Sequence, residues 1–271
     1  MTQSIIVVKL GGTDGVDFSA ICKDAAELLK QNMQLVLVHG GSAEANSLGD
    51  ALGAPPKFII SPSGYTSRYT DRKTLEIFAM AVNGKINTLL VEQLQMLGIN
   101  ALGLSGLDGK LMQATRKDSI QSIENGKRKI IRDDYTGKIE CVNTELLQTL
   151  LAGGYLPVIA PMAVSEKGEA LNVDGDRAAA MVSSALKADV LILLTAVPGL
   201  MKNFPDVSTT IQHLTQSQLP DALEAAQGRM KKKVLGAEEA LKGGVKRVII
   251  ADGRIQNPIS NALEGKGTII Q

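Results

Sequence analysis

The segment "IIVVKLGG", residues 5–12, decides the fold class, because an apolar run of strand length ends directly in two glycines. A run that lacks polar alternation is expected where helices cover both faces of a sheet. Glycine lets the backbone N–H groups after such a strand approach an anion closely. Residues 5–12 therefore predict a buried strand that runs into a ligand-binding turn.

The same pattern recurs along the chain, where short β-branched runs alternate with longer helical patterns. The expected strands are 5–10, 34–39, 99–104, 156–160, 190–195 and 247–251. The expected helices are 17–31, 43–52, 72–97, 143–152, 174–186, 219–226 and 230–242. This alternation predicts an α/β fold, a three-layer αβα sandwich with a mostly parallel central sheet.

Two stretches interrupt the alternation. Residues 57–69, rich in Ser, Pro and Gly, and residues 110–139, polar and alternating, are interpreted as β-hairpin lids over a ligand crevice. We expect one domain over residues 1–271 that is divided into two lobes, 1–165 and 166–271. The reason for the division is that the motifs before and after residue 165 serve different ligands.

The composition excludes several classes of protein. A net charge of +1 gives no overall attraction to nucleic acid or to an anionic membrane, and 3% aromatic residues without tryptophan argue against base stacking. Apolar runs are too short to span a bilayer, and the first ten residues lack the pattern of a secretory signal. Two cysteines are too few for a disulfide framework, which favours a cytoplasmic protein. No metal-ligand spacing of His and Cys occurs.

Three strand ends run into glycine, in "VKLGGTDG", "VHGGSAEAN" and "ALGLSGLDG". One such turn is common in any α/β protein, but three at carboxyl strand ends favour an anion site. None matches the P-loop pattern, and neither G-x-G-x-x-G nor the protein-kinase signatures occur. A protein that binds phosphate here would use a different cradle.

Cations stand at unfavourable places near these turns. Lys9 lies within an apolar strand, which is costly unless its ammonium reaches an anion or extends to the surface. "GRMKKKV", residues 228–234, puts four cations at a helix start, where they oppose the helix dipole. Arg68, just before a helix capped by Thr70 or Asp71, could clamp a carboxylate or form a surface ion pair.

The acidic stretch "LNVDGDRAAA", residues 171–180, has three possible roles: a metal loop, a general base or a helix start. An EF-hand would need glycine and glutamate where Arg177 and Ser183 stand, so calcium is excluded. Asp174 or Gly175 fits a helix N-cap. That role leaves Asn172 and Asp176 to be explained.

In order and spacing, "VKLGG", "VHGGS", "SRYTDRKTLE", "NVDGD", "LLTAVPGL" and "GRMKKKV" resemble the amino acid kinase family, in its N-acetylglutamate kinase branch. "GLSGLDGKL", "DYTG" and "AQGRMK" are similar to the subgroup whose acceptor is attached to a carrier protein. The resemblance implies an ATP-dependent kinase that phosphorylates the side-chain carboxylate of α-aminoadipate on the acidic amino-group carrier LysW. The product would be an acyl phosphate in lysine biosynthesis.

The resemblance also implies the roles of individual residues. Catalytic residues would be Lys9, Lys233 and Asp176, with the aspartate orienting the two lysines. Acceptor ligands would be Gly40, Gly41, Ser42, Arg68 and Asn172. The nucleotide would contact Gly11, Gly12, Thr195, Ala196, Gly199, Met201, Gly228 and Met230, within borders formed by residues 195–201 and 227–230. Mg²⁺ would bind through the phosphates of ATP and not through a protein metal motif.

Two departures from the acetylglutamate kinase pattern leave the acceptor open. Ser42 stands where that pattern has a third glycine, and Asp174-Gly175-Asp176 replaces Asn-Ala-Asp. The alternatives are N-acetylglutamate kinase, a dual aminoadipate and glutamate carrier-protein kinase of arginine biosynthesis, and a non-catalytic amino-acid or nucleotide sensor. Because Lys9, Lys233 and Asp176 are all present, the sequence favours the enzyme over the sensor.

Two surfaces are expected to serve partners. Lys127, Arg128, Lys129 and Arg132 either dock the acidic carrier or form a solvated hairpin. The long helix at 72–97 is expected to form a homodimer.

Overall fold

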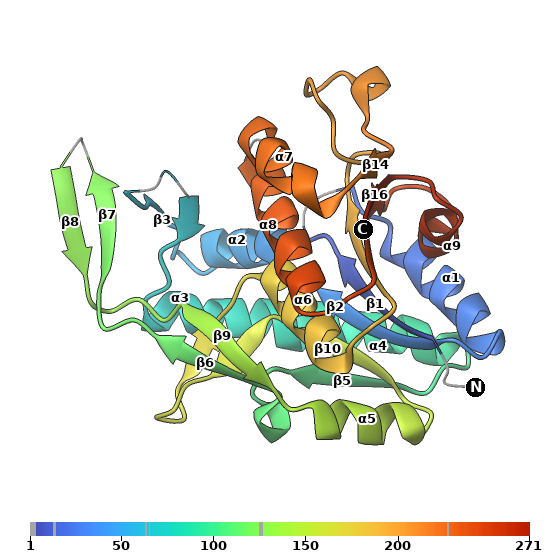
Figure 1. Cartoon of the computed structure of the whole chain (residues 1–271). Coiled ribbons are helices and arrows are strands. Elements are labelled where there is room, and N and C mark those ends of the chain that lie inside the picture. The colour runs from blue at the N-terminus through green and yellow to red at the C-terminus, as the bar shows by residue number, and fades with distance from the viewer. Residues whose placement is uncertain (1–3, 13–14, 63, 65, 125–126, 227) are drawn as a thin grey trace.

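The computed structural model describes residues 4–12, 15–62, 64, 66–124, 127–226 and 228–271, and an eight-stranded sheet forms its centre (Figure 1). The strand order is β14-β16-β15-β13-β1-β2-β10-β5. The strands are β1 (Ile5–Leu10), β2 (Gln34–His39), β5 (Ala101–Ser105), β10 (Leu156–Ala160), β13 (Val190–Thr195), β14 (His213–Leu214), β15 (Arg247–Asp252) and β16 (Thr268–Ile270). All neighbours from β15 to β5 pair in parallel, and only β16 pairs antiparallel with β15. The predicted mostly parallel sheet is confirmed.

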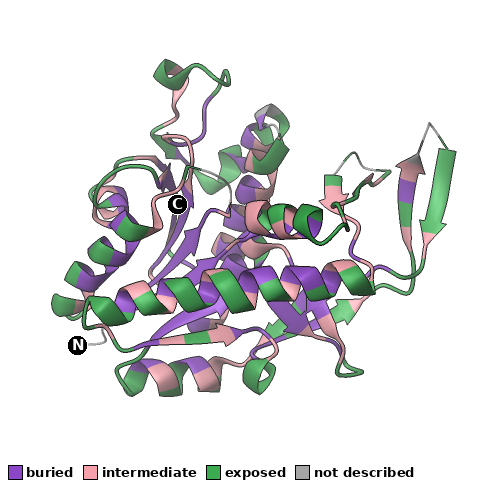
Figure 2. Cartoon of the chain, turned by 180° about the vertical axis from the view of Figure 1, so that it is seen from behind, coloured by how far each residue is buried: buried purple, intermediate pink, exposed green. Residues whose placement is uncertain are grey.

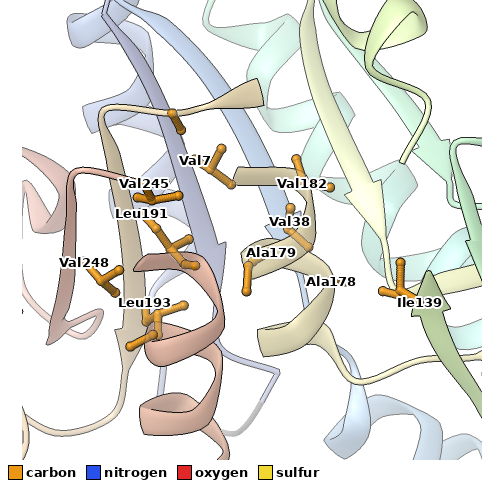
Figure 3. Close-up of a cluster of buried hydrophobic side chains, with 14 of the residues drawn as sticks. Val7, Val38, Ile139, Ala178, Ala179, Val182, Leu191, Leu193, Val245 and Val248 are labelled. Atoms are coloured by element: carbon orange, nitrogen blue, oxygen red, sulfur yellow. The ribbon is translucent and has the colours of Figure 1, made fainter. Parts of the chain in front are cut away.

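Helices cover both faces of this sheet, because side chains alternate between the faces along each strand. Val7 and Leu191 pack on one face and Ile6 and Leu35 on the other, and Figure 3 shows part of the first cluster. The first face is covered by α5 (Thr144–Ala152), α6 (Gly175–Leu186) and α8 (Gly228–Lys242), the second by α1 (Phe18–Lys30), α4 (Thr88–Met96) and α9 (Pro258–Leu263). The buried strands lie between these two layers in Figure 2. The helices and the sheet between them thus form the predicted three-layer αβα arrangement.

The helix expected at 72–97 is one continuous helical segment, but its middle is not α-helical. It consists of α3 (Arg72–Ala79), a π-helical segment Met80–Asn87 and α4. The expected helix is confirmed as one helical segment, and its π-helical middle, Met80–Asn87, is a feature that the prediction did not specify. The apolar periodicity of this stretch does not distinguish a π-helix, which is rare and often found at functional sites. Here Asn87 Nδ2 donates to the carbonyl of Val158 (2.8 Å) and lies 3.0 Å from His39 Nε2, at the end of β2.

The two predicted insertions form strands, but they are organised differently from two simple hairpins. The first contains the hairpin β3 (Phe58–Ile60) and β4 (Thr66–Arg68). In the second, β6 (Met112–Arg116) and β9 (Gly137–Val142) join β11 (Met162–Val164) and β12 (Ala170–Asn172) in a four-stranded sheet. Only β7 (Ile120–Glu124) and β8 (Lys127–Ile131) project from the body as a hairpin (Figure 1).

The remaining elements are short or connect the layers. They are α2 (Ser42–Ala51), α7 (Leu219–Ala225) and three 3₁₀ turns at Asp108–Lys110, Val207–Thr209 and Gln216–Gln218. The sequence does not predict β11, β12, α9, β14 or β16, because runs of two to six residues give no usable periodicity. In the part of the chain that the structure describes, no helix is long and apolar enough to cross a membrane. The central sheet joins strands from both predicted lobes, with β13 paired to β1.

Candidate active site

A crevice of about 1030 Å³ opens where β1 and β2 end in their glycine turns. Carboxyl strand ends are the usual place for a ligand in a parallel α/β sheet. Of the residues predicted for the site, those that line the crevice are Lys9, Gly11, Gly12, Gly40, Gly41, Ser42, Arg68, Asn172, Asp176, Thr195, Gly228 and Lys233. The fold thus brings together residues that lie more than 200 positions apart in the sequence.

The two glycine turns pack against each other backbone to backbone. A Cβ on Gly12 would lie 2.3 Å from the nitrogen of Gly41, and a Cβ on Gly40 would lie 2.8 Å from the nitrogen of Gly12. A Cβ on Gly41 would lie 2.6 Å from Val82 in the π-helical segment. Side chains are excluded at all three positions, and α2 begins directly at the turn without a side-chain cap. Such a helix start offers N–H groups and a positive dipole end to an anion.

A cluster of Lys9, Asp176 and Lys233 lies at the bottom of this crevice, and it is called the lysine–aspartate cluster below. Lys9 Nζ lies 3.0 Å and Lys233 Nζ 2.9 Å from the same oxygen, Asp176 Oδ1. Each of the three residues is buried, with 6 to 7% of its surface exposed. Two cations on one carboxylate leave a net positive charge at a place where water has little access.

The charges of the cluster shift the pKa values of its members. Burial disfavours ionisation of Asp176, but the two ammonium groups outweigh burial and hold the pKa of its carboxyl well below the usual range. Burial lowers the pKa of Lys233 to about 8, opposed by Asp176 and reinforced by the positive charge of Lys9. Asp176 is therefore a carboxylate at neutral pH, and Lys233 loses its proton more easily than an ordinary lysine.

Helix geometry brings Asp176 and Lys233 together. Asp174 is the N-cap of α6, and its Oδ1 accepts the backbone N–H of Asp176 (3.0 Å) and of Arg177 (3.2 Å), as the capping pattern predicts. Helix α8 then crosses α6 closely at Gly236, where a Cβ would lie 3.3 Å from the carbonyl oxygen of Asp176. Figure 1 shows the two helices side by side. Gly236 allows the approach that lets Lys233 reach the carboxylate.

Arg68 and Asn172 also line the crevice. The Nη2 of Arg68 donates to the Ser42 carbonyl (3.2 Å) and to Asn46 Oδ1 (2.5 Å), and its guanidinium lies 5.4 Å from the centre of the Phe58 ring. Burial lowers the pKa of Arg68, and the positive charge of Arg229 lowers it further. Among the residues that the structure describes, Arg68 forms no ion pair of the kind that the sequence left open, and it borders the crevice near a second arginine.

His39 lies beside the cluster but faces away from solvent. Its ring is fully buried and its Nδ1 lies 2.9 Å from the carbonyl of Gly40. Burial lowers the pKa of His39 to about 4, and the backbone carbonyl only partly opposes this shift. A neutral histidine that holds the turn after β2 is a structural group, as its place at a strand end suggests.

Four residues predicted for the nucleotide side do not line the crevice: Ala196, Gly199, Met201 and Met230. Gly199 packs so closely on Thr268 that a Cβ would lie 2.7 Å from its Oγ1, and Met201 is buried in a bridge to Thr210. Met230 packs against the main apolar cluster. Residue 227, the start of the second predicted border, lies outside the described residues.

The walls of the crevice are strongly cationic. Among the described lining residues, nine lysines and arginines accompany only two carboxylates, whereas the whole chain has a net charge of +1. The nine cations are Lys9, Arg68, Lys117, Lys138, Arg177, Arg229, Lys231, Lys232 and Lys233. Lys117 and Lys138 were not predicted, because they come from the β6–β9 insertion and no motif marks them. Lys232 forms an ion pair with Asp174 (3.3 Å).

Both carboxylates of the crevice already have cationic partners. Asp176 holds two lysines, and Asp174 caps α6 and pairs with Lys232. Among the described residues no group of three or more His, Cys, Asp or Glu side chains could hold a metal ion. The donor set therefore suits a cation that arrives with an anionic ligand, and not one ligated mainly by protein carboxylates.

Fold and crevice together define an α/β protein that binds anionic ligands at the carboxyl edge of a parallel sheet. Comparison with known proteins gives the family: the amino acid kinase family profile matches residues 4–252. The chain belongs to the amino acid kinase family.

Individual relatives resemble it over nearly the full length. The [LysW]-aminoadipate kinase of Deinococcus radiodurans is 55% identical over 98% of this chain and 91% of its own. The [LysW]-aminoadipate kinase of Thermus thermophilus is 51% identical over 98% and 100%. Among solved structures, an N-acetylglutamate synthase from Neisseria gonorrhoeae, complexed with coenzyme A and N-acetyl-glutamate, superposes with a TM-score of 0.80 at 25% identity. That match covers 98% of this chain and 59% of the synthase.

The close crossing of α6 and α8 generates a prediction about Gly236. In Gly236→Ala the new Cβ displaces the Asp176 backbone by a few tenths of an ångström, while alanine favours the helix by about 1 kcal/mol. We expect kcat for phosphoryl transfer to fall about tenfold with little loss of stability, because small misplacements of reacting groups are costly.

Gly243→Ala is the matched control, at the other end of the same helix pair. Its Cβ would lie 2.1 Å from Ser184 Oγ, far from the cluster, so it should lower stability by about 1–3 kcal/mol and leave kcat unchanged. Steady-state kinetics and thermal unfolding of both variants check this. Equal kcat in the two variants would show that the crossing of α6 and α8 does not determine the geometry of the lysine–aspartate cluster.

Proposed function

We propose that this protein is an ATP-dependent kinase that phosphorylates the side-chain carboxylate of α-aminoadipate carried on the LysW amino-group carrier protein. The observation that carries the proposal is the lysine–aspartate cluster, two buried ammonium groups on one carboxylate oxygen at the bottom of a cationic crevice. Relatives that are 55% and 51% identical bear the name [LysW]-aminoadipate kinase, which supports the choice of acceptor. The product is an acyl phosphate for lysine biosynthesis.

The reaction joins two anions, so its catalysis is chiefly positioning and charge neutralisation. An oxygen of the acceptor carboxylate attacks the γ-phosphorus of ATP, the bond from that phosphorus to the β–γ bridging oxygen breaks, and ADP leaves with the electron pair. Lys9 from β1 and Lys233 from α8 neutralise charge on the transferring group from two sides. Asp176 fixes both flexible side chains and, as a carboxylate with two cationic partners, leaves one positive charge for the phosphoryl oxygens.

Backbone N–H groups complete the anion site. Gly11 and Gly12 donate to the ATP phosphates, and Gly41 and Ser42 at the start of α2 donate to the acceptor. Gly40 borders the acceptor, while its own N–H donates to the carbonyl of Leu10 (3.0 Å). Because the turns touch backbone to backbone, the two reactants meet where the turns meet. Mg²⁺ bound to ATP oxygens supplies further charge neutralisation and needs no protein carboxylate.

Most of the acceptor contacts come from residues 1–165, and the nucleotide contacts beyond Gly11 and Gly12 come from residues 166–271. In residues 1–165 we assign Arg68 to the acceptor, and Asn172 of β12 joins it there. In residues 166–271 we assign Thr195 and Gly228 to the nucleotide, and Ala196, Gly199, Met201 and Met230 to the structure behind it. A cytoplasmic location accords with amino-acid biosynthesis.

A hydroxamate assay tests the function directly, because hydroxylamine traps an acyl phosphate. Carrier-bound aminoadipate, carrier-bound glutamate and free N-acetylglutamate are offered separately with ATP, and we expect the first to be the best acceptor. Lys9→Ala and Lys233→Ala should each lose about 100-fold or more in kcat, since each removes charge stabilisation of the transferring group.

Lys30→Ala is the control, since Lys30 forms an exposed ion pair with Glu27 on α1 and should leave kcat unchanged. Wild-type transfer to N-acetylglutamate alone would reassign the acceptor. Transfer at the wild-type rate in Lys9→Ala or Lys233→Ala would overturn the role assigned to that lysine. A wild-type protein that transfers phosphate to none of the three acceptors would favour the sensor.

We propose that the acidic carrier docks on the β7–β8 hairpin and its base. Lys127, Arg128, Lys129 and Arg132 are exposed there, and Ile130 has 56% of its surface exposed. β3 packs beside β7, and its exposed Phe58 lines the crevice. A cationic surface with apolar contacts at the crevice mouth suits an acidic protein that delivers its carboxylate inward.

Reversing two hairpin charges, in Lys127→Glu with Arg128→Glu, tests this docking surface. We expect the KM for carrier-bound substrate to rise about tenfold and the KM for ATP to stay unchanged, with the difference shrinking at high salt. The control reverses Lys23 and Lys30 on α1, which are exposed on the far face of the sheet. If both double variants behave alike, the hairpin does not dock the carrier.

We propose further that the protein is a homodimer through the long helical segment 72–96. Met80, Leu89 and Met96 are exposed along it, by 50, 44 and 82% of their surfaces, and this segment carries much of the exposed outer face in Figure 2. Exposed large apolar side chains in a row favour burial by a second copy. Sedimentation equilibrium that returned the monomer mass would exclude the dimer.

A further inference from the structure

A buried carboxylate lies behind the acceptor side of the crevice, at the base of the β7–β8 hairpin. Asp134 has 3% of its surface exposed. Its Oδ1 accepts the backbone N–H of Thr70 (2.9 Å), and its Oδ2 accepts the backbone N–H (3.1 Å) and the hydroxyl of Thr136. Residues 64 positions apart are thus joined by one side chain.

Thr70 continues this connection to two residues that line the crevice. Its side chain is fully buried, and its Oγ1 donates to the carbonyl of Arg68 (3.2 Å) and accepts from Asn172 Nδ2 (3.2 Å). Backbone bonds run in parallel, from Tyr135 N–H to the Thr70 carbonyl (2.7 Å) and from Asn172 N–H to the Tyr135 carbonyl (2.9 Å). The amide of Asn172 is therefore turned so that its nitrogen points at Thr70.

Starting helix α3 does not require this arrangement. The N-cap of α3 is Asp71, whose Oδ1 accepts the N–H of Thr74 (2.8 Å), so Thr70 is free of that task. Burying a carboxylate costs several kcal/mol unless hydrogen bonds satisfy it, and an apolar residue would fill the same space at lower cost. The carboxylate oxygens of Asp134 accept hydrogen bonds from Thr70 and Thr136. This arrangement indicates that Asp134 fixes the positions of these two residues and is not there for stability.

We propose that Asp134 and Thr70 are positioning residues for the acceptor: they hold Arg68 and Asn172 in the geometry that binds it. The proposal rests on the function proposed above, in which Arg68 and Asn172 contact the acceptor. Asp134 sets the place of the Thr70 backbone, and Thr70 Oγ1 sets the Asn172 amide and the Arg68 backbone. Neither touches the nucleotide side, where Lys233 and Gly228 lie.

Thr70→Val is the sharpest test, because valine has the shape of threonine and lacks only the hydroxyl. We expect the KM for carrier-bound aminoadipate to rise about tenfold or more, because the hydroxyl's two hydrogen bonds, to the Arg68 carbonyl and from Asn172 Nδ2, are lost. The KM for ATP and kcat at saturation should stay within twofold of wild type. Thr70→Ser, which keeps the hydroxyl, should restore the wild-type KM. Asp134→Asn, which replaces one acceptor oxygen by a donor, should raise the acceptor KM at least as much.

Tyr69→Phe is the matched control. It removes the bond from the Tyr69 hydroxyl to Asp133 (2.6 Å), in the same two segments but outside the connection to Asn172. It should leave the acceptor KM unchanged. An acceptor KM in Thr70→Val equal to that of Tyr69→Phe, or an equal rise in the KM for ATP, overturns the positioning role. A wild-type protein that phosphorylates no carboxylate acceptor overturns the proposed function and the positioning role with it.

Discussion

Lys9, Asp176 and Lys233 are three charged groups buried at one site, and the structure around them is arranged so that their charges can be buried together. Lys9 and Lys233 are each 6% exposed, and neither ammonium could be buried there without the carboxylate of Asp176. Removing one partner of a buried ion pair typically costs about 3–5 kcal/mol. Both lysines therefore depend on the same counterion, the carboxylate of Asp176. An anionic ligand that enters the crevice meets a net positive charge that water screens only weakly.

Close backbone contacts make this charge arrangement possible. The glycine turns after β1 and β2 touch at Gly12 and Gly40, and α8 reaches the backbone of Asp176 at Gly236. In each case a side chain would separate elements that must meet. The parallel sheet determines where the site forms, because β1 and β2 both end at the edge where α6 and α8 converge. The fold therefore builds the site directly, because β1 of the sheet carries Lys9 and the helices α6 and α8 carry its partners Asp176 and Lys233.

Much of this could be read from the sequence, for identifiable physical reasons. The six expected strands all exist within two residues of their predicted starts, because strands buried on both faces are continuously apolar. Lys9 and Asp176 stand out because charge inside apolar surroundings needs an explanation. The π-helical segment and the four-stranded sheet could not be predicted, since they depend on contacts between distant segments, and α9 is too short to give a periodic pattern. The bonds from Asp134 to Thr70 and from Thr70 to Asn172 have no sequence signal for the same reason.

The pH dependence of kcat/KM for ATP tests the central claim most directly, namely that a charged Lys233 held by Asp176 stabilises the transferring phosphoryl group. The pKa of Lys233 is lowered to about 8, so its ammonium is lost as the pH rises through that value. We predict that kcat/KM falls above about pH 8 in the wild type, since this ratio reports the ionisation of the free enzyme. In Lys233→Arg, whose guanidinium stays charged, a weaker activity should persist to higher pH. A wild-type profile flat to pH 10, or the same fall in Lys233→Arg, would contradict the account.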